Sequence, residues 1–490
     1  MAGRTASAVT WGTASRLAAQ VVQLASIAVL ARLIAPADFG LVAIVTTFVG
    51  FAMIFTNLGI GAFLVHAQDP SPADMATAFW LNAVSGLALT ALFVAVSGPL
   101  ADAYGQPRLQ ALVVVGSLSF CLSLGIVHNA LLERSMQFSS LALVEPSAIL
   151  VSALVAIGLA VAGLGATALV VGHVVATVWK TACLWWMVRW VPRSRPTRSS
   201  LRALWSYSGA LFGFNVVNYW ARNADNLLLG AVAGPGPLAF YSRAYALMLL
   251  PVQQVTQVLG RVLFPALTRL RDDEDRLRRG YARSLRLLAA VTFPLSLGLA
   301  AAAPAVVGVV LGSRWSEAAL LLAILSLSGP AQIVSGTTGA LYQAVGRTDL
   351  QLRRGLVSAA ALVAAIAAGL AWGAVGVAVA VSLAYWVVAP VVTVPVWRLV
   401  GLRSSSVLRM LRAPAGCAAA MGVAVLALGR ALDGSTTPAA VVLLVQVTTG
   451  AVVYAALLRL CARQLWDELG SLARGAARRR SARSHPHVPA

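Results

Sequence analysis

Residues 207–231 read YSGALFGFNVVNYWARNADNLLLGA, and this stretch decides the fold class. It is long enough to cross a lipid bilayer as a helix, which takes about 20 mostly apolar residues. Its polar residues Asn215, Asn218, Arg222 and Asp225 fall on one face of such a helix, and Tyr219 adjoins them. A face of this kind is costly against lipid, so it indicates a membrane helix whose polar side meets other helices or water.

The composition of the whole chain agrees with a membrane protein. Of its 490 residues, 59% are hydrophobic and 11% are charged, whereas soluble domains carry about 25% charged residues. The four cysteines show no C-x-x-C spacing and are interpreted as small hydrophobes, without a metal site. The net charge of +21 is spread over short clusters between apolar runs, a pattern that disfavours nucleic-acid binding.

Apolar runs separated by turn residues predict an all-α integral membrane protein with about 14 transmembrane helices. The predicted spans are 10–31, 39–64, 77–98, 109–131, 141–162, 165–187, 207–231, 237–260, 287–311, 317–343, 355–372, 374–397, 413–430 and 438–458. The first run contains Arg16 and is too long for a secretory signal, so we expect an uncleaved first helix. The pair 355–372 and 374–397 has almost no linker and is the weakest boundary.

The distribution of arginine predicts the orientation in the membrane. With the N-terminus in the cytoplasm, most of the 37 Lys and Arg residues fall on the inside. The outside loops then hold only Arg32, Arg108, Arg314 and Arg430. We therefore expect a protein of the bacterial cell membrane with both termini in the cytoplasm.

The first span repeats the polar spacing of the seventh. Arg16, Gln20 and Gln23 share a helix face, and Gln20-Val-Val-Gln23 parallels Asn215-Val-Val-Asn218. Both spans are followed by a turn that contains proline. Together these features predict a six-helix unit that occurs twice in one orientation around a central cavity.

The predicted organisation follows from this repeat. It has an N-terminal six-helix bundle over 1–188, a cytoplasmic linker over 189–206 and a C-terminal six-helix bundle over 207–398. Two additional transmembrane helices occupy 399–460, and a basic cytoplasmic tail over 461–490 is expected to be disordered.

The candidate substrate-binding residues line the predicted cavity: Arg16, Gln20, Gln23, Asn215, Asn218, Tyr219 and Arg222. Arg222 and Asp225 lie one helical turn apart, so they are candidates for a structural ion pair, and Asp225 for ion coupling. Lys180 and Arg243 are weaker candidates, because each could sit at the membrane interface. A set richer in arginine than in carboxylates suits an anionic substrate, above all a phosphate.

Several chemistries are missing from the sequence. It has no G-x-x-x-x-G-K-[ST] loop for ATP and no H-E-x-x-H metal motif, so no cofactor is expected. No loop is long enough to form a domain outside the membrane, which disfavours a membrane-bound glycosyltransferase or ligase. A transporter is therefore favoured over an enzyme.

Two stretches carry a family resemblance. One runs through Asn223-Ala-Asp225-Asn-Leu-Leu-Leu-Gly230, Leu238-Ala-Phe-Tyr241-Ser-Arg-Ala-Tyr245, Leu250-Pro251 and Phe264-Pro265-Ala-Leu-Thr-Arg269. The other is the opening, Trp11-Gly12 through Pro36-Ala-Asp38-Phe39-Gly40. They resemble the polysaccharide flippase family of the multidrug/oligosaccharidyl-lipid/polysaccharide exporter superfamily, and most of all its lipopolysaccharide-biosynthesis and colanic-acid exporter branch, over about residues 5–400.

The resemblance implies two six-helix bundles, two extra C-terminal helices and alternating access. It also implies transfer of an undecaprenyl-diphosphate-linked oligosaccharide from the inner to the outer leaflet, with polysaccharide assembly enzymes as possible partners. Three alternatives stay open: a cation-coupled drug or metabolite antiporter of the same superfamily, a membrane sugar polymerase or ligase, and a scaffold that does not transport.

Overall fold

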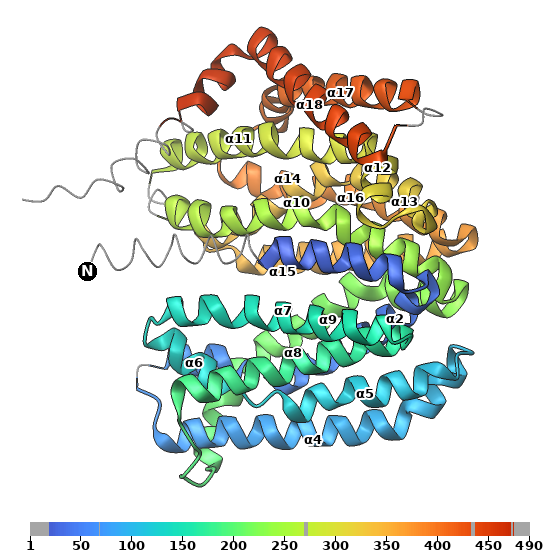
Figure 1. Ribbon diagram of the computed structural model, residues 1–490. Coiled ribbons are helices and arrows are strands. Elements are labelled where there is room, and N and C mark those ends of the chain that lie inside the picture. The colour runs from blue at the N-terminus through green and yellow to red at the C-terminus, as the bar shows by residue number, and fades with distance from the viewer. Residues whose placement is uncertain (1–18, 68, 269–272, 433–436, 472–473, 475–490) are drawn as a thin grey trace, which may run out of the picture. The chain divides into compact units, whose positions relative to one another are not determined.

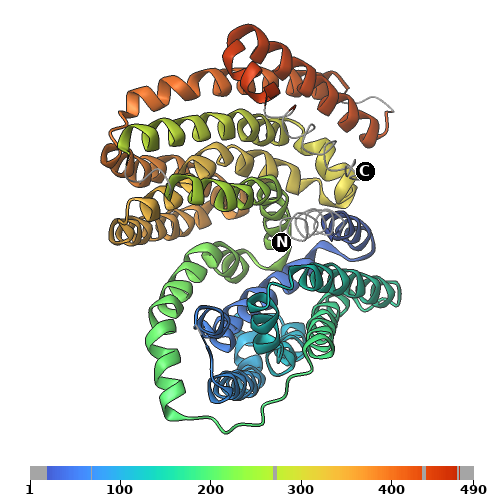
Figure 2. The same ribbon diagram turned by 90° about the vertical axis from the view of Figure 1, so that its left-hand side faces the viewer.

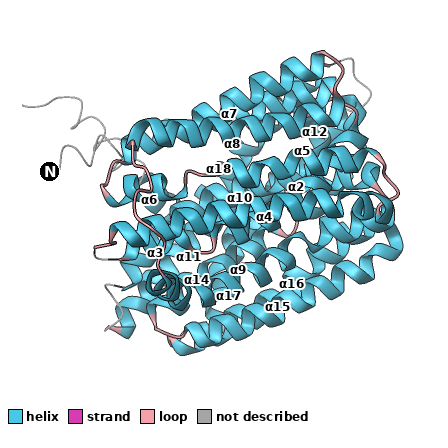
Figure 3. Ribbon diagram, turned by 90° about the horizontal axis from the view of Figure 1, so that it is seen from below, coloured by secondary structure: helices cyan, strands magenta, loops and turns pink. Residues whose placement is uncertain are grey.

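The structure is a computed structural model that describes residues 19–67, 69–268, 273–432, 437–471 and 474. Throughout these residues the regular structure is helical and contains no strand (Figure 3). In hydrocarbon a backbone polar group has no water to bond, and a helix satisfies these groups within its own segment. The apolar composition and the helical architecture therefore have one cause.

Each predicted span corresponds to a helix or a helix pair (Figure 1). The described part of the first span belongs to the helix Ala19–Leu33. The helices that follow, up to the Gly-Pro turn at Gly234, are α2 (Pro36–Asn57), α3 (Ile60–His66), α4 (Pro72–Ala103), α5 (Arg108–Leu122), α6 (Ile126–Arg134), α7 (Phe138–Val161), α8 (Gly165–Val188) and α9 (Arg198–Ala233).

The remaining helices begin with α10, after the same turn. They are α10 (Pro235–Thr268), α11 (Glu274–Ala301), α12 (Ala303–Val310), the 3-10 turn η1 (Ser313–Trp315), α13 (Glu317–Ser326), α14 (Gly329–Ala344), α15 (Thr348–Gly369), the 3-10 turn η2 (Leu370–Trp372), α16 (Gly373–Leu399), α17 (Ser404–Leu432) and α18 (Ala439–Cys461).

Length and hydropathy test the membrane assignment within the described residues. Eight helical segments are long and apolar enough to cross a membrane, or up to ten when each bent pair counts as one span. The bent pairs are α5 with α6 and α13 with α14, which bend by 45° and 46°. One of the eight segments, Asp349–Leu399, contains both α15 and α16. Helices α9 and α10 are not among these segments, and α9 carries the polar stripe of residues 207–231.

The chain divides into two compact units. Unit 1 comprises residues 1–242 with 310–315, and unit 2 comprises 243–309 with 316–490. This division differs from the predicted bundles 1–188 and 207–398, because α9 packs on α2, α3 and α4 and so belongs to unit 1. The twofold repeat of six helices stays a prediction.

Unit 1 holds its helices close together through small residues. A Cβ atom at Gly86 of α4 would lie 2.5 Å from the carbonyl oxygen of Phe120 in α5. At Gly40 of α2 it would lie 1.8 Å from the carbonyl oxygen of Pro235 at the start of α10. Lipid tails are as apolar as leucine, so helices in a membrane gain mainly from close van der Waals packing of this kind.

Trp315 completes unit 1 from a distant part of the sequence. Gly312 turns the chain with φ +95, and η1 then places the Trp315 indole in a fully buried position. Its Nε1 donates a hydrogen bond to the carbonyl oxygen of Ala31 at 3.0 Å. The rings of Phe39 and Phe240 lie edge-on to the indole, with centroids 5.1 and 5.8 Å away.

Replacing this indole tests its contribution to stability. Trp315→Ala is expected to lower the free energy of unfolding by about 3–5 kcal/mol, since it leaves a large cavity in a packed interior. The measurement is thermal unfolding of the purified protein in detergent. Trp372→Ala is the matched control, because that tryptophan is 74% exposed. Equal losses of stability in the two variants would contradict this account.

Unit 2 is built around hydrogen-bonded aromatic side chains. Tyr281 of α11 shares a 2.8 Å hydrogen bond with the hydroxyl of Thr337 in α14 and accepts a 3.1 Å hydrogen bond from Nε1 of Trp397 in α16. All three side chains are buried. Figure 2 shows α17 and α18 (red) beside α11 (yellow-green), against which α17 packs along its length.

The weakest predicted boundary, between 355–372 and 374–397, is confirmed. Helix α15 ends at Gly369, and α16 begins at Gly373 after a single 3-10 turn. Gly373 adopts φ +64, which favours glycine. The helices cross so closely that a Cβ atom at Gly376 would lie 2.3 Å from the carbonyl oxygen of Gly369. The turn at Gly373 and the close contact at Gly376 therefore allow the two helices to follow each other without a longer linker.

Residues 463–471 form a helix after α18, although the region 461–490 was expected to be disordered. The helix buries Leu465 against Ala290 and Leu458. The Glu468 carboxylate accepts hydrogen bonds from Arg283 and, at 2.6 Å, from Arg286, both in α11. Apolar burial and this carboxylate hold the helix in place. The basic composition of the region led the sequence analysis to predict disorder instead.

The pH dependence of this attachment follows from the pKa of Glu468. Burial by itself would raise this pKa, but the hydrogen bonds and charges of Arg283 and Arg286 hold it below its ordinary value. A lowered pKa in the folded state means that the attachment is complete above the ordinary carboxyl pKa, about 4.3, and is lost as pH falls through the lower folded value.

We therefore expect the helix 463–471 to loosen on acidification below about pH 4. A spin label at Ser471→Cys, in a chain without its native cysteines, reports this as a gain of mobility in an electron paramagnetic resonance titration. Glu468→Gln should show the high mobility of the acidified wild type at every pH, because it has no carboxylate to lose. A wild-type signal that does not change between pH 7 and pH 3 would rule the attachment out.

Candidate functional site

Helix α9 carries the polar stripe that the sequence singled out. It begins after Thr197, whose side-chain oxygen accepts a hydrogen bond from the backbone N–H of Ser200 at 3.2 Å. It runs for 36 residues and ends at Gly234, which adopts φ +82. The N-cap and the glycine stop fix the register of the helix, and so they fix the direction in which each polar side chain points.

Aromatic side chains attach α9 to α2. The ring of Phe51 lies 4.5 Å from Trp220 and 6.0 Å from Tyr219, and Phe55 lies 5.0 Å from Phe212. The Tyr219 hydroxyl donates a 2.6 Å hydrogen bond to the carbonyl oxygen of Thr47. Tyr219 thus lies in the packing between two helices, and its hydroxyl is already engaged.

Asp225 is the buried member of the stripe. This residue is only 4% exposed. One carboxylate oxygen accepts a 2.8 Å hydrogen bond from the hydroxyl of Tyr241 in α10, and the other accepts one from the backbone N–H of Asn226. Since Tyr241 is itself fully buried, this pair joins α9 to the first turns of α10 within unit 1.

The predicted ion pair between Arg222 and Asp225 does not form. No salt bridge links them among the described residues; instead the carboxylate points to Tyr241 while Arg222 lies on an exposed part of α9. The two positions are one helical turn apart, but the aspartate side chain is short and turned inward. Spacing along the helix showed that the pair was feasible, and the tyrosine across the Gly234 turn provides the nearer partner.

The exposed part of the stripe contains Asn218 and Arg222, with Asn215 half-buried beside them. Neither a hydrogen bond nor an ion pair with other described residues occupies the Arg222 guanidinium. A guanidinium offers five N–H donors in a planar fork that fits phosphate oxygens in pairs. Amide side chains can both donate to and accept from sugar hydroxyls. This face is therefore equipped to bind a phosphorylated sugar.

The corresponding face of the first helix is partly described. Gln23 is exposed and Gln20 is half-buried, while Arg16 lies outside the described residues. The helix Ala19–Leu33 and α9 both belong to unit 1, whereas the repeat predicted one of them in each bundle.

The two weaker candidates have different surroundings. The Lys180 ammonium in α8 forms a 3.0 Å salt bridge with Glu145 of α7, and both side chains are largely exposed. This pair joins neighbouring helices, a role that sequence reasoning missed because it considered the two charges separately. Arg243 is half-buried in α10, at the first position of unit 2.

Sequence reasoning also missed Tyr241, which appeared only as part of a family motif. The available signal was its position relative to Asp225: the two are 16 residues apart, on either side of the Gly-Pro turn at Gly234. Polar residues on both sides of a tight turn between membrane helices are candidates for such a bond, because lipid offers neither of them a partner.

The sequence comparisons agree with the resemblance. The family model of polysaccharide biosynthesis proteins matches residues 29–320, so the chain belongs to the polysaccharide biosynthesis protein family. It is 25% identical to the teichuronic acid biosynthesis protein TuaB of Bacillus subtilis over 69% of the chain and 71% of that protein. It is also 25% identical to the lipopolysaccharide biosynthesis protein WzxC of Escherichia coli over 76% of the chain and 77% of that protein.

A third relative is named as a transport protein. The chain is 26% identical to the succinoglycan biosynthesis transport protein ExoT of Rhizobium meliloti, over 73% of each chain. The resemblance to polysaccharide exporters that the sequence motifs predicted is therefore confirmed at the level of the family.

Solved structures confirm the fold. The lipid II flippase MurJ in an inward closed conformation matches with a TM-score of 0.73 and 14% identity, over 93% of this chain and 99% of that one. An inward-facing multidrug resistance transporter of the MATE family, in the MOP superfamily, matches with a TM-score of 0.59 and 16% identity, over 80% of this chain and 96% of that one. The protein is thus an all-α, multi-pass membrane protein with the fold of these transporters.

A double-mutant cycle tests the bond between Asp225 and Tyr241. Tyr241→Phe is expected to cost about 1.5–3 kcal/mol of unfolding free energy, the range for a hydrogen bond to a charged group. In an Asp225→Asn background the same change should cost clearly less, because the carboxylate has already been removed. Both are measured by unfolding of the detergent-purified protein.

The control for this cycle is Tyr454→Phe. That hydroxyl donates to the carbonyl oxygen of Ala290 in unit 2 and shares no partner with Asp225, so its effect should add to that of Asp225→Asn. Additive losses for Asp225→Asn and Tyr241→Phe would show that the two side chains do not interact.

Proposed function

We propose that the protein is a flippase that moves an undecaprenyl-diphosphate-linked oligosaccharide, or a related polysaccharide precursor, from the inner to the outer leaflet. The observation that carries this proposal is the exposed, arginine-bearing face of α9, on a fold shared with a lipid II flippase. The family and the named roles of TuaB, WzxC and ExoT in making or transporting bacterial polysaccharides support the substrate class.

The chemistry of the face suggests how it divides the substrate. Arg222 binds the diphosphate, since a guanidinium forms short, paired hydrogen bonds with phosphate oxygens. Asn215 and Asn218 lie toward the start of α9 from Arg222 and bind hydroxyl groups of the first sugars. Arg16, Gln20 and Gln23 add further contacts from the first helix. The polyprenyl tail stays in the bilayer, where it needs no polar partner.

The packing around the face gives Asp225 and Tyr219 a supporting role. Their polar atoms are bonded to Tyr241 and to Thr47, so they position α9 and leave Arg222 and Asn218 available. The exposed part of the stripe is then cationic, which favours an anionic lipid over the cationic compounds expected of a drug antiporter. Alternating access carries the bound diphosphate from one side of the membrane to the other.

The orientation belongs to the same proposal. The protein lies in the bacterial inner membrane with both termini in the cytoplasm. The arginine clusters between the spans then face the anionic lipid of the cytoplasmic leaflet. Precursors arrive at this side, and enzymes of polysaccharide assembly act as partners on either side.

The experiment replaces Arg222 in a host that depends on this protein for surface polysaccharide. Arg222→Ala is expected to reduce export at least about tenfold, since it removes a charged hydrogen-bonding group worth about 1.5–3 kcal/mol. Arg222→Lys should restore part of the export because it keeps the charge but not the fork. Export is measured as cell-surface polysaccharide, with membrane levels of each variant followed by immunoblot.

The matched control is Arg202→Ala, an exposed arginine at the start of the same helix and in the predicted cytoplasmic segment. It should leave export unchanged. Normal export by Arg222→Ala at wild-type protein levels would exclude Arg222 from the transport mechanism.

A further inference from the structure

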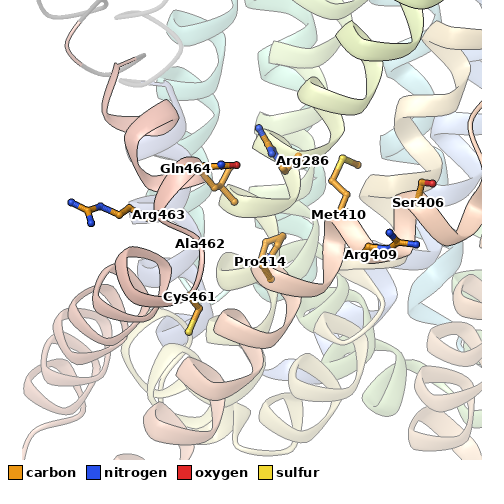
Figure 4. A pocket seen from close by; sticks show the side chains of 11 residues that line it. Arg286, Ser406, Arg409, Met410, Pro414, Cys461, Ala462, Arg463 and Gln464 are labelled. Carbon is orange, nitrogen blue, oxygen red and sulfur yellow. The ribbon is translucent and has the colours of Figure 1, made fainter.

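Unit 2 contains a cavity of about 550 Å³ that the transport proposal does not use. It lies where the first turns of α17, the middle of α11, the end of α18 and the helix 463–471 come together (Figure 4). The polar side chains that line it are Arg286, Ser406, Arg409, Arg463 and Gln464.

The cavity carries an excess of positive charge. Arg286, Arg409 and Arg463 line it from three different segments, and none of the described residues that line it is a carboxylate. Glu468, the salt-bridge partner of Arg286, is also bound by Arg283. Within the described chain, Arg409 and Arg463 have no salt bridge, and the buried Nε of Arg286 has no hydrogen-bond partner. Donors are therefore left over for an anion.

The backbone adds to this potential. Helix α18 ends at Cys461, the chain turns at Ala462 with φ −143, and a new helix starts, so that Arg463, Gln464 and Leu465 line the cavity. The cavity is also lined by Ser406, in the first turn of α17. The first N–H groups of a helix lack partners within it and carry partial positive charge. Both helix N-termini thus add positive potential to the cavity that the arginines line, and such a potential suits a phosphate.

The surroundings indicate that the phosphate belongs to a lipid. Met410 and Pro414 form an apolar part of the wall. On the helices that border the cavity, Leu408 of α17 is 67% exposed and Leu460 of α18 is 79% exposed. Trp466 of the helix 463–471 is partly exposed. Exposed leucines at the ends of membrane helices suit acyl chains, and a tryptophan and arginines beside them are typical of the headgroup level.

We propose that this cavity binds the phosphodiester headgroup of an anionic glycerophospholipid in the leaflet on the arginine-rich side of the membrane. The phosphate accepts hydrogen bonds from Arg286 and Arg409. Arg463, whose side chain points away from these two in Figure 4, turns toward the phosphate when the lipid binds. The acyl chains lie along the apolar surface of α17 and α18. Basic pockets between the ends of membrane helices are a known mode of lipid recognition. The bound lipid also holds the helix 463–471 against α11, together with Glu468. The inference does not depend on the transported substrate.

The test uses the full-length protein in a neutral detergent. Phosphatidylglycerol is titrated against phosphatidylcholine of the same acyl chains, and bound lipid is counted by native mass spectrometry and by the shift in thermal unfolding. We expect saturable binding of phosphatidylglycerol. The double variant Arg409→Gln and Arg463→Gln should weaken it at least about tenfold, in line with the loss of charged hydrogen bonds.

The control double variant is Arg412→Gln and Arg459→Gln. Arg412 is exposed on α17 and Arg459 is exposed on α18, and neither lines the cavity. The two double variants lower the net charge equally. The control variant should bind phosphatidylglycerol as the wild type does.

Three outcomes would overturn the proposal. Equal weakening by the two double variants would show a general surface attraction. Equal binding of phosphatidylcholine would remove the requirement for a net negative charge. Inorganic phosphate that stabilises the protein as much as phosphatidylglycerol would identify a free anion site. None of these results bears on export, so the proposed function is tested separately.

Discussion

Every backbone N–H and C=O in the hydrocarbon core must find its hydrogen-bond partner within the protein, and this constraint decides the architecture. Helices satisfy it segment by segment, so the described chain is helical from Ala19 onward. The same constraint makes tight helix contacts the main source of stability, because apolar side chains gain little by leaving lipid for protein. Gly40, Gly86 and Gly376 are positions where backbones approach closely, and larger residues there would push the helices apart.

Polar side chains in the spans are exceptions, and several of them are matched by a partner on a neighbouring helix. Asp225 is matched by Tyr241, and Tyr219 donates to a backbone carbonyl of α2. Lys180 and Glu145 neutralise each other between α7 and α8. Arg222 is left without such a partner among the described residues, on the same helix as two satisfied neighbours. A charge that the fold leaves available is a stronger functional candidate than one that the fold has already neutralised.

The sequence predicted the helices well and the partners poorly. Apolar runs and turn residues are local signals, so each span falls, within the described residues, on a helix or a helix pair, and even the boundary near Gly373 is confirmed. Partners depend on which faces meet in three dimensions. Spacing suggested Arg222 for Asp225, whereas the tyrosine beyond the Gly234 turn is the observed partner. The helix 463–471 was missed because its basic composition outweighed the signal of Leu465 and Glu468. The sequence thus predicted the candidate site as a stripe of polar residues. Only the structure distinguished the residues that bond to neighbouring helices from those that are free to bind a ligand.

The position of Trp315 has a consequence for how the protein is made. Unit 1 is otherwise complete in sequence by residue 242, yet its interior includes an indole that is synthesised much later. While the ribosome is still translating the residues in between, the space beside Phe39 and the carbonyl of Ala31 has no occupant. The N-terminal half must therefore wait in an unfinished state in the membrane, and a fragment cut at the end of unit 1 would retain that hole permanently.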